Sequence, residues 1–188
     1  WRPTHLLGTR VSGKALGIVG MGRIGRAVAR RAGQGFGMRV SYWSRTRLPE
    51  AEERVLGVSW RPTLDTLVSG ADFVTLHCPA TPETRHLIDA AALRQFRPHA
   101  FLVNTARGDV VDEAALLEAM NAGTIAGAAL DVFDGEPSVN PAILARPDIV
   151  TLPHLGSATV ESRVAMGERA LRNITAFVEG VEPPDRVV

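Results

Sequence analysis

The chain has 188 residues, 45% of them apolar and 22% charged, a composition typical of one soluble globular domain. Its formal net charge of +1 gives no field to attract nucleic acid, and no apolar run approaches the roughly 18 residues of a membrane span. We therefore expect no nucleic-acid and no membrane partner. The N-terminal WRPTHLLGTR has neither a signal-peptide pattern nor an initiating methionine, so we expect a cytoplasmic protein whose chain begins further upstream.

Short apolar runs alternate with helical patterns along the chain. Strands are predicted at residues 15–20, 38–43, 55–60, 72–78, 100–105, 126–133 and 148–153. Helices are predicted at residues 23–37, 64–70, 88–96, 111–123 and 158–180, the first with Ile24, Val28 and Ala32 on one face. This alternation predicts an α/β fold: a Rossmann-type doubly wound parallel sheet with helices on both faces, forming a single dinucleotide-binding domain over residues 1–188.

The stretch GMGRIG, residues 20–25, follows the first predicted strand and opens the first predicted helix. In that context Gly20 permits a tight turn, Gly22 lets the backbone approach a pyrophosphate, and Gly25 lets the helix pack close to the strand. The N–H groups of the first helical turn, at Arg23 and Ile24, would face the phosphates, and the Arg23 side chain could add a charge. The alternative is a structural turn without a ligand.

The segment SRTR, residues 44–47, stands at the end of the second predicted strand, where a site for NAD usually has an acid. Ser44 takes the place of that acid. Arg45 can pair with a phosphate, and the hydroxyls of Ser44 and Thr46 can donate to it. We therefore predict NADP(H) as the preferred cofactor, with NAD(H) possible. The alternative is a solvated turn.

Three later strand ends carry further reactive residues. Arg107 follows the strand at 100–105, Glu136 follows the strand at 126–133, and His154 follows the last strand. Carboxyl ends of parallel strands share one edge of the sheet, so we expect the three to converge. Arginine can grip a carboxylate, histidine can exchange a proton near neutral pH, and a carboxylate can orient that histidine. Singly, each has a structural alternative: a loop cap, a solvated turn residue or a strand-end histidine.

The remaining histidines and the cysteine suggest less chemistry. No spacing among His, Cys and acidic residues indicates a metal site. His77 is interpreted as a core or crevice residue. Cys78 is interpreted as a small buried apolar group rather than a nucleophile.

The ordered motifs SGKALGIVGMGRIG, LHCPATPETRHLI, NTARGDVVDE, ALDVFDGEP and LPHLGSAT resemble the coenzyme-binding domain of the D-isomer-specific 2-hydroxyacid dehydrogenases. The neighbourhood of YWSRTR is most similar to the glyoxylate and hydroxypyruvate reductases. This resemblance implies that Arg107 binds the substrate, His154 is the acid–base residue and Glu136 is its partner. It also implies a cofactor contact for each of Cys78, Pro79, Thr84, Thr105, Ala106 and Asp131.

The resemblance further implies NAD(P)H-dependent reduction of a small 2-keto acid to a D-2-hydroxy acid, in a homodimer formed through this domain. Members of the family also have a substrate domain, which is missing from this chain, so we expect the chain alone to bind cofactor but to be inactive. Two alternatives stay open: another dehydrogenase of the family, of the phosphoglycerate or phosphite type, and a non-enzymatic dinucleotide-sensing module.

Overall fold

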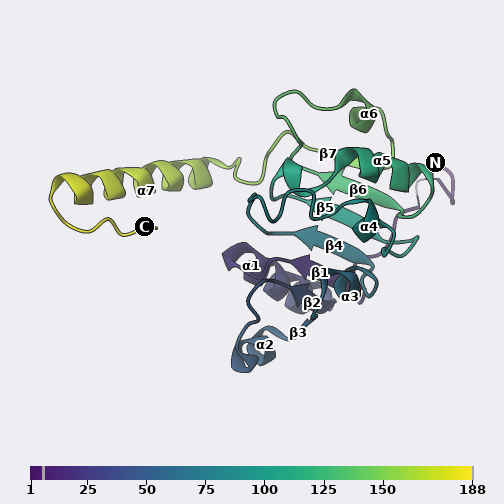
Figure 1. Cartoon of the computed structure of the whole chain (residues 1–188), viewed down its shortest axis with the longest axis horizontal. Coiled ribbons are helices and arrows are strands. Elements are labelled where there is room, and N and C mark those ends of the chain that lie inside the picture. The colour runs from purple at the N-terminus through teal and green to yellow at the C-terminus, as the bar shows by residue number, and fades with distance from the viewer. Residues whose placement is uncertain (6, 188) are drawn as a thin grey trace. The chain divides into compact units, whose positions relative to one another are not determined.

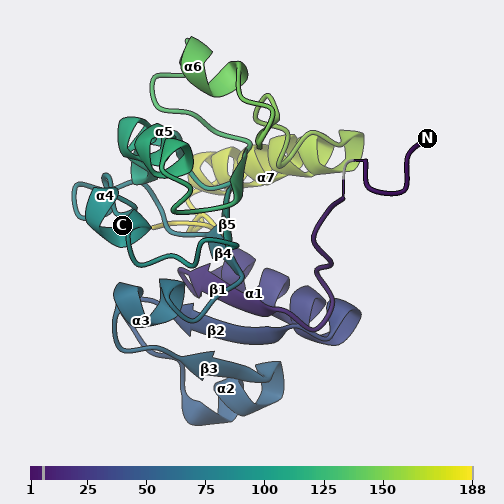
Figure 2. The same cartoon turned by 90° about the vertical axis from the view of Figure 1, so that its right-hand side faces the viewer.

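A computed structural model describes residues 1–5 and 7–187 of the chain, which form two units, Trp1–Pro153 and His154–Val188. The first unit is built on a seven-stranded sheet of order β3-β2-β1-β4-β5-β6-β7 (Figures 1 and 2). Its strands are β1 Ala15–Val19, β2 Arg39–Trp43, β3 Val58–Trp60, β4 Phe73–Leu76, β5 Phe101–Asn104, β6 Gly127–Leu130 and β7 Ile149–Thr151.

Every pair of neighbouring strands in this sheet is parallel. The chain runs outward from β1 to β2 and β3, then crosses back to β4 on the other side of β1. The order therefore reverses between β1 and β4. Open α/β sheets bind ligands at such a reversal, beyond the carboxyl ends of the strands. The predicted fold class is confirmed.

Helices connect the strands and cover both faces of the sheet. They are α1 Arg23–Arg30, α2 Glu50–Leu56, α3 Leu64–Val68, α4 Ala90–Leu93, α5 Glu113–Asn121 and α6 Pro141–Leu144. Two short irregular helices are the π-helix η1 Arg31–Gly35, which continues α1, and the 3-10 helix η2 Gly108–Val110.

Two hydrophobic clusters lie on the two faces of the sheet, and β1 shows how they are separated. Leu16 and Ile18 belong to the cluster that includes Ala29 of α1. Val19 belongs to the other cluster, with Leu67 of α3 and Leu116 of α5. Alternate residues of a strand point to opposite faces, so β1 is buried on both sides.

Several predicted elements differ from the structure. Residues 55–60, predicted as a strand, contain the end of α2, and only Val58–Trp60 are extended. The predicted helix 88–96 contains only the single turn α4, capped by Asp89. The helices α2 and α6 were not predicted.

The predicted buried face of the first helix was also wrong at Ile24, whose side chain is 66% exposed. The buried positions of α1 are Gly25 and Ala29, while Ala32, in η1, is buried as predicted. Gly25 faces inward because α1 contacts the backbone of the preceding turn there, and this contact sets the rotation of the whole helix.

The second unit consists of α7 Val160–Val178 and the residues on either side of it. The side chain of Thr159 caps α7 by accepting a hydrogen bond from the N–H of Ser162. The C-terminal tail is tied to α7, since the carboxylate of Asp185 pairs with Arg169 and accepts a hydrogen bond from the amide of Asn173. Among the helices in the described part of the chain, none is both long and apolar enough to cross a lipid bilayer.

Candidate cofactor and active site

A cavity of about 540 Å³ lies at the carboxyl ends of β1, β2 and β4, where the strand order reverses. Its volume is in the range of small-molecule sites. Predicted cofactor residues that line it are Gly20, Gly22, Ser44, Arg45, Thr46, Cys78, Pro79 and Thr84. Three segments far apart in sequence are thus brought together as the parallel sheet requires.

The glycine turn after β1 is shaped by close backbone contacts. Gly20 has a φ of +93°, and a Cβ on it would lie 2.7 Å from the carbonyl carbon of His77. A Cβ on Gly25 would lie 2.2 Å from the carbonyl oxygen of Gly20. Gly22 differs, because a Cβ there would meet no atom of the described residues within 4 Å. Its bare backbone instead leaves open space at the cavity, as a ligand's pyrophosphate would need.

The N-terminus of α1 begins at this turn, with Gly22 as its N-cap. No side chain in the described part of the chain caps it, and its first turn holds no acid, so its N–H groups and helix dipole suit an anion. Arg26, one turn along, also lines the cavity. Its guanidinium is paired with the carboxylate of Glu52 on α2, with distances of 2.5 and 3.2 Å.

The segment after β2 is the predicted 2′-phosphate site. The Ser44 hydroxyl donates a 2.5 Å hydrogen bond to the carbonyl oxygen of Thr46, which closes a small turn around Arg45. Within the described part of the chain, the exposed Arg45 side chain has no hydrogen-bond or ion-pair partner. Glu83 also lines the cavity, and its pKa is lowered first by the Thr81 hydroxyl and to a smaller degree by the charge of Arg45.

The segment after β4 forms another wall of the cavity. The His77 ring is 3.1 Å from the Thr75 hydroxyl, and burial lowers its pKa, which favours the neutral ring. Burial also raises the pKa of the Cys78 thiol. A protonated, half-buried thiol is a poor nucleophile, which agrees with the interpretation of Cys78 as an apolar group. The Thr84 hydroxyl donates to the carbonyl oxygen of Pro79 at 2.6 Å and so closes this loop.

The loop after β5 carries Thr105, Ala106 and Arg107, and it is held by a buried residue that sequence reasoning missed. Asn104 is 1% exposed. Its amide nitrogen donates to the carbonyl oxygen of Arg107 at 2.8 Å, and its amide oxygen accepts from the N–H of Ala106 at 3.0 Å. The Arg107 side chain is exposed, and its guanidinium donates to the carbonyl oxygen of Ala106. Asn104 thereby fixes the backbone from which Arg107 projects.

The loop after β6 packs directly on the Arg107 loop. A Cβ on Gly108 would lie 1.9 Å from the carbonyl carbon of Phe133. Asp131 is buried, and its N–H donates to the carbonyl oxygen of Asn104 at 2.9 Å. Oε1 of Glu136 accepts a hydrogen bond from the N–H of Phe133 at 2.7 Å. The loops that carry Arg107 and Glu136 are therefore in contact.

His154 is the first residue of the second unit, where its backbone is left-handed with a φ of +55°. Its predicted grouping with Arg107 and Glu136 stays a prediction. No cluster of three or more potential metal ligands occurs among the His, Cys, Asp and Glu residues that the structure describes.

Comparison with known proteins agrees with this geometry. Residues 1–156 match the family model of the D-isomer specific 2-hydroxyacid dehydrogenase NAD binding domain. Glyoxylate reductase from Thermococcus litoralis is 48% identical over 187 residues, which is all of this chain but 56% of that protein. The chain thus spans about half the length of the curated relatives it matches.

Solved structures show the same similarity. A glyoxylate reductase from Paecilomyes thermophila superimposes with a TM-score of 0.88 at 38% identity, over 95% of this chain and 53% of that one. An NADPH-dependent glyoxylate/hydroxypyruvate reductase from Sinorhizobium meliloti, in complex with NADP and malonate, gives a TM-score of 0.82 at 40% identity, over 88% and 50%. The chain therefore belongs to the D-isomer specific 2-hydroxyacid dehydrogenase family, through the NAD-binding domain of that family.

Proposed function

We propose that this chain is the coenzyme-binding part of an NAD(P)H-dependent reductase that converts a small 2-keto acid, of the glyoxylate or hydroxypyruvate type, to a D-2-hydroxy acid. The observation that carries the proposal is a single cavity. Gly22, at the uncapped N-terminus of α1, and the segment Ser44–Thr46 both line it. In dinucleotide-binding folds of this kind, the pyrophosphate lies at the turn after the first strand and the adenosine ribose at the end of the second strand.

Each part of this cavity has a proposed contact with the cofactor. The glycine turn and the N–H groups of Arg23, Ile24 and Gly25 would bind the pyrophosphate. Arg45 would pair with the 2′-phosphate of NADP(H), assisted by the hydroxyls of Ser44 and Thr46. Cys78, Pro79 and Thr84 line the cavity and would contact the adenosine end. Thr105, Ala106 and Asp131 lie outside its lining, on the loops after β5 and β6, and would contact the nicotinamide end. The Sinorhizobium meliloti relative was solved in complex with NADP, which supports NADP(H) as a cofactor for this cavity.

The reduced nicotinamide, when bound, supplies the hydride that the reaction needs. Arg107 would hold the substrate's carboxylate and carbonyl oxygen and stabilise the negative charge that develops on that oxygen. His154 would deliver a proton to the same oxygen, and Glu136 would orient the histidine ring. The hydrogen bond from Phe133 to Glu136 supports this role, because it fixes the direction of the carboxylate.

A second domain would complete the site. The relatives named glyoxylate reductase have nearly twice the length of this chain, which leaves room for a substrate domain. Closure of such a domain would exclude water and hold the other side of the substrate, so the 188 residues alone would bind cofactor but turn over little. We further propose a cytoplasmic homodimer that associates through this domain, which light scattering during gel filtration would test.

The reaction itself is tested with a substrate panel on the protein that contains this chain and any further domain. Glyoxylate and hydroxypyruvate are offered with NADPH or NADH, and 3-phosphoglycerate and phosphite with NADP⁺ or NAD⁺. We expect fastest turnover with glyoxylate or hydroxypyruvate and NADPH. Preference for phosphoglycerate or phosphite would replace the proposed substrate. Tight NADPH binding without turnover of any of these would favour a dinucleotide-sensing module.

A further inference from the structure

The two arginines of the segment after β2 have very different surroundings. Arg45 is exposed and has no hydrogen-bond or ion-pair partner within the described part of the chain. Arg47, two residues later, lines the same cavity but is already paired. Its Nε and Nη2 donate to the two carboxylate oxygens of Glu53, at 2.9 and 2.8 Å. Only the first of these side chains is therefore available to a ligand without breaking an existing contact.

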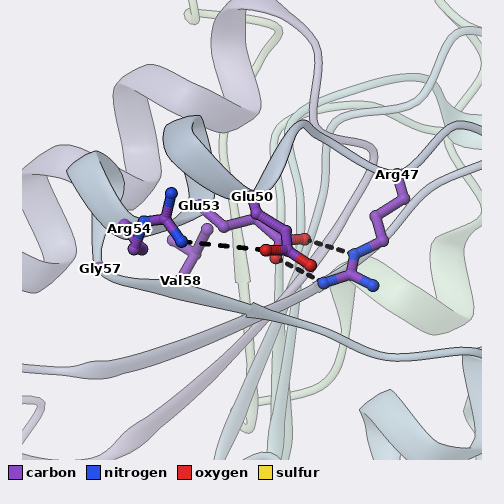
Figure 3. Close-up of a pocket in the computed structure, with 6 residues that line it drawn as sticks. All are labelled: Arg47, Glu50, Glu53, Arg54, Gly57 and Val58. Carbon is purple, nitrogen blue, oxygen red and sulfur yellow. Dashed lines mark hydrogen bonds and ion pairs between the residues drawn. The ribbon is translucent and has the colours of Figure 1, made fainter.

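The Arg47–Glu53 pair is held from both sides. The two parallel hydrogen bonds match the fork of a guanidinium to the two oxygens of a carboxylate, the strongest geometry for such a pair. The Arg47 guanidinium also lies 5.2 Å from the centroid of the Trp60 ring, within the range of a cation–π contact. Figure 3 shows Arg47 pointing toward Glu53 on α2, beside the separate pair of Glu50 and Arg54.

Tyr42 connects this pair to the backbone of the segment. Its ring is fully buried, and its hydroxyl donates to Oε1 of Glu53 at 2.6 Å. The same hydroxyl accepts a hydrogen bond from the N–H of Leu48 at 2.8 Å. Burial raises the pKa of Tyr42 to about 12, so the hydroxyl keeps its proton throughout the physiological range.

The segment is thus fixed at both ends. Before it, the carbonyl oxygen of Trp43 accepts a 2.8 Å hydrogen bond from the N–H of Gly20, in the phosphate turn. After it, Leu48 is bound by Tyr42, and Leu48 is itself buried. Only the four residues 44–47 lie between these anchors, so the position of Arg45 relative to the phosphate turn is set by the two contacts.

We propose that Arg47, Glu53 and Tyr42 form a positioning network that holds Arg45 in place for the 2′-phosphate of NADP(H), and that Arg47 is not itself a phosphate ligand. This inference rests on the proposed role of Arg45. A backbone that is already fixed leaves the Arg45 side chain fewer positions to lose when it binds, so the network increases affinity for NADPH without touching it. NADH has no 2′-phosphate, so its affinity does not depend on where Arg45 lies.

The competing possibility is that Arg47 leaves Glu53 to bind the phosphate. That movement would strand the carboxylate of Glu53, which is 8% exposed, without its cation. The movement would also give up two charge-assisted hydrogen bonds and the contact of the Arg47 guanidinium with the Trp60 ring. The two possibilities predict opposite effects of Glu53→Gln. If Arg47 only positions the segment, loss of the Glu53 carboxylate loosens the segment and weakens NADPH binding. If Arg47 binds the phosphate, the same substitution releases Arg47 and strengthens NADPH binding.

The test is calorimetric titration of the chain and its variants with NADPH and with NADH. Arg47→Lys keeps the charge but loses the fork, so NADPH affinity should fall about fivefold to tenfold and NADH affinity less than twofold. Glu53→Gln should have the same effects as Arg47→Lys: a fall in NADPH affinity and little change in NADH affinity. The control is Arg54→Lys, an equally conservative change of an exposed arginine whose pair with Glu50 is 3.8 Å long, and it should change neither affinity.

A double variant separates the network from its premise. If Arg47 acts through Arg45, Arg45→Ala combined with Arg47→Lys should bind NADPH no more weakly than Arg45→Ala alone. Additive losses, tighter NADPH binding by Glu53→Gln, or equal losses for NADPH and NADH would each overturn the network. If Arg45→Ala leaves NADPH affinity unchanged, the proposed 2′-phosphate site itself is wrong. Thermal unfolding of every variant shows which of them are folded. If Glu53→Gln is unfolded, the titrations of Arg47→Lys test the network.

Discussion

Gly108 and Phe133 are in backbone contact: a Cβ on Gly108 would lie 1.9 Å from the Phe133 carbonyl carbon and 2.1 Å from its oxygen. The two residues belong to the loops after β5 and β6, which carry Arg107 and Glu136. The proposed substrate-binding arginine and the proposed partner of the acid–base histidine are therefore mounted on loops that cannot separate without breaking this contact.

Gly108→Ala should destabilise the chain, because backbone cannot move aside as the end of a flexible side chain can. We expect a loss of about 3 kcal/mol in the free energy of unfolding, measured by denaturant titration. Gly33→Ala is the control, since a Cβ there meets no atom within 4 Å, and it should stay within about 1 kcal/mol of the parent chain. A fully stable Gly108→Ala chain would show that the two loops are not locked together.

Gly22→Ala should separate cofactor binding from stability. The added methyl group would meet no atom of residues 1–5 and 7–187 within 4 Å, and the Gly22 φ of −74° suits alanine. The free energy of unfolding should therefore change by less than about 0.5 kcal/mol. The methyl group would occupy space needed by the pyrophosphate, so the Kd values for NADPH and NADH should both rise about tenfold or more. Unchanged affinity for both cofactors would remove Gly22 from the proposed site.

Glu83→Gln should strengthen NADPH binding. Glu83 lines the same cavity as Arg45, and its carboxylate adds negative charge where the 2′-phosphate would bind. Removing that charge should lower the Kd for NADPH about two- to threefold and leave the Kd for NADH unchanged. The difference in NADPH affinity between the variant and the parent chain should become smaller at high salt. Weaker NADPH binding in this variant would mean that Glu83 contacts the cofactor instead of repelling it.

Asp72 should make the free energy of unfolding depend on pH. Its carboxylate accepts a hydrogen bond from the N–H of Ala15 at 2.8 Å and lies 2.9 Å from the His99 ring. These contacts, the Ala15 hydrogen bond above all, lower the pKa of Asp72 below its ordinary value of 3.8. A lowered pKa stabilises the fold at pH values above that ordinary value, and the stabilisation is lost as pH falls through the lowered pKa.

Asp72→Asn should therefore cost about 2 kcal/mol at pH 7, since a buried charged hydrogen-bond acceptor is lost. The difference between variant and parent should shrink as the pH is lowered below 4, because the parent's carboxyl becomes protonated as well. Denaturant titrations at pH 7 and pH 3 measure it. A difference of equal size at both pH values would mean that ionisation of Asp72 does not stabilise the fold.

His154→Ala should abolish most turnover in the protein that contains a complete site, by about 10²- to 10⁴-fold in kcat, because the proton donor is lost. Cofactor affinity should remain, since His154 has no proposed contact with the adenosine or phosphate groups. Stopped-flow or steady-state assays with glyoxylate measure turnover, and titration with NADPH measures binding. Unchanged kcat would refute the acid–base role.

Most of the strands and the glycine turn could be predicted because each depends on local pattern: apolar runs for the strands and G-x-G-x-x-G in its strand–helix context. The helix α2 could not be predicted from periodicity, because its first turn is acidic and its end merges with the apolar run VLGVSW. Better signals were Pro49 at its N-cap, followed by acids, and Gly57 after its end.

That missed helix limited what could be inferred about the site. Arg45 and Arg47 are alike in the sequence, and only Glu53 on α2 distinguishes them, by occupying Arg47. Asn104 was missed for a related reason. An asparagine at a strand end gives no pattern of its own, and its two hydrogen bonds become visible only when the following loop is folded back onto it.

The segment Ser44–Thr46 is proposed to bind the 2′-phosphate of NADP(H). Calorimetric titration of the purified chain with NADPH and, separately, with NADH tests this role. We expect NADPH to bind at least about tenfold more tightly, a difference of about 1.4 kcal/mol in binding free energy. Equal affinity, or tighter binding of NADH, would contradict it.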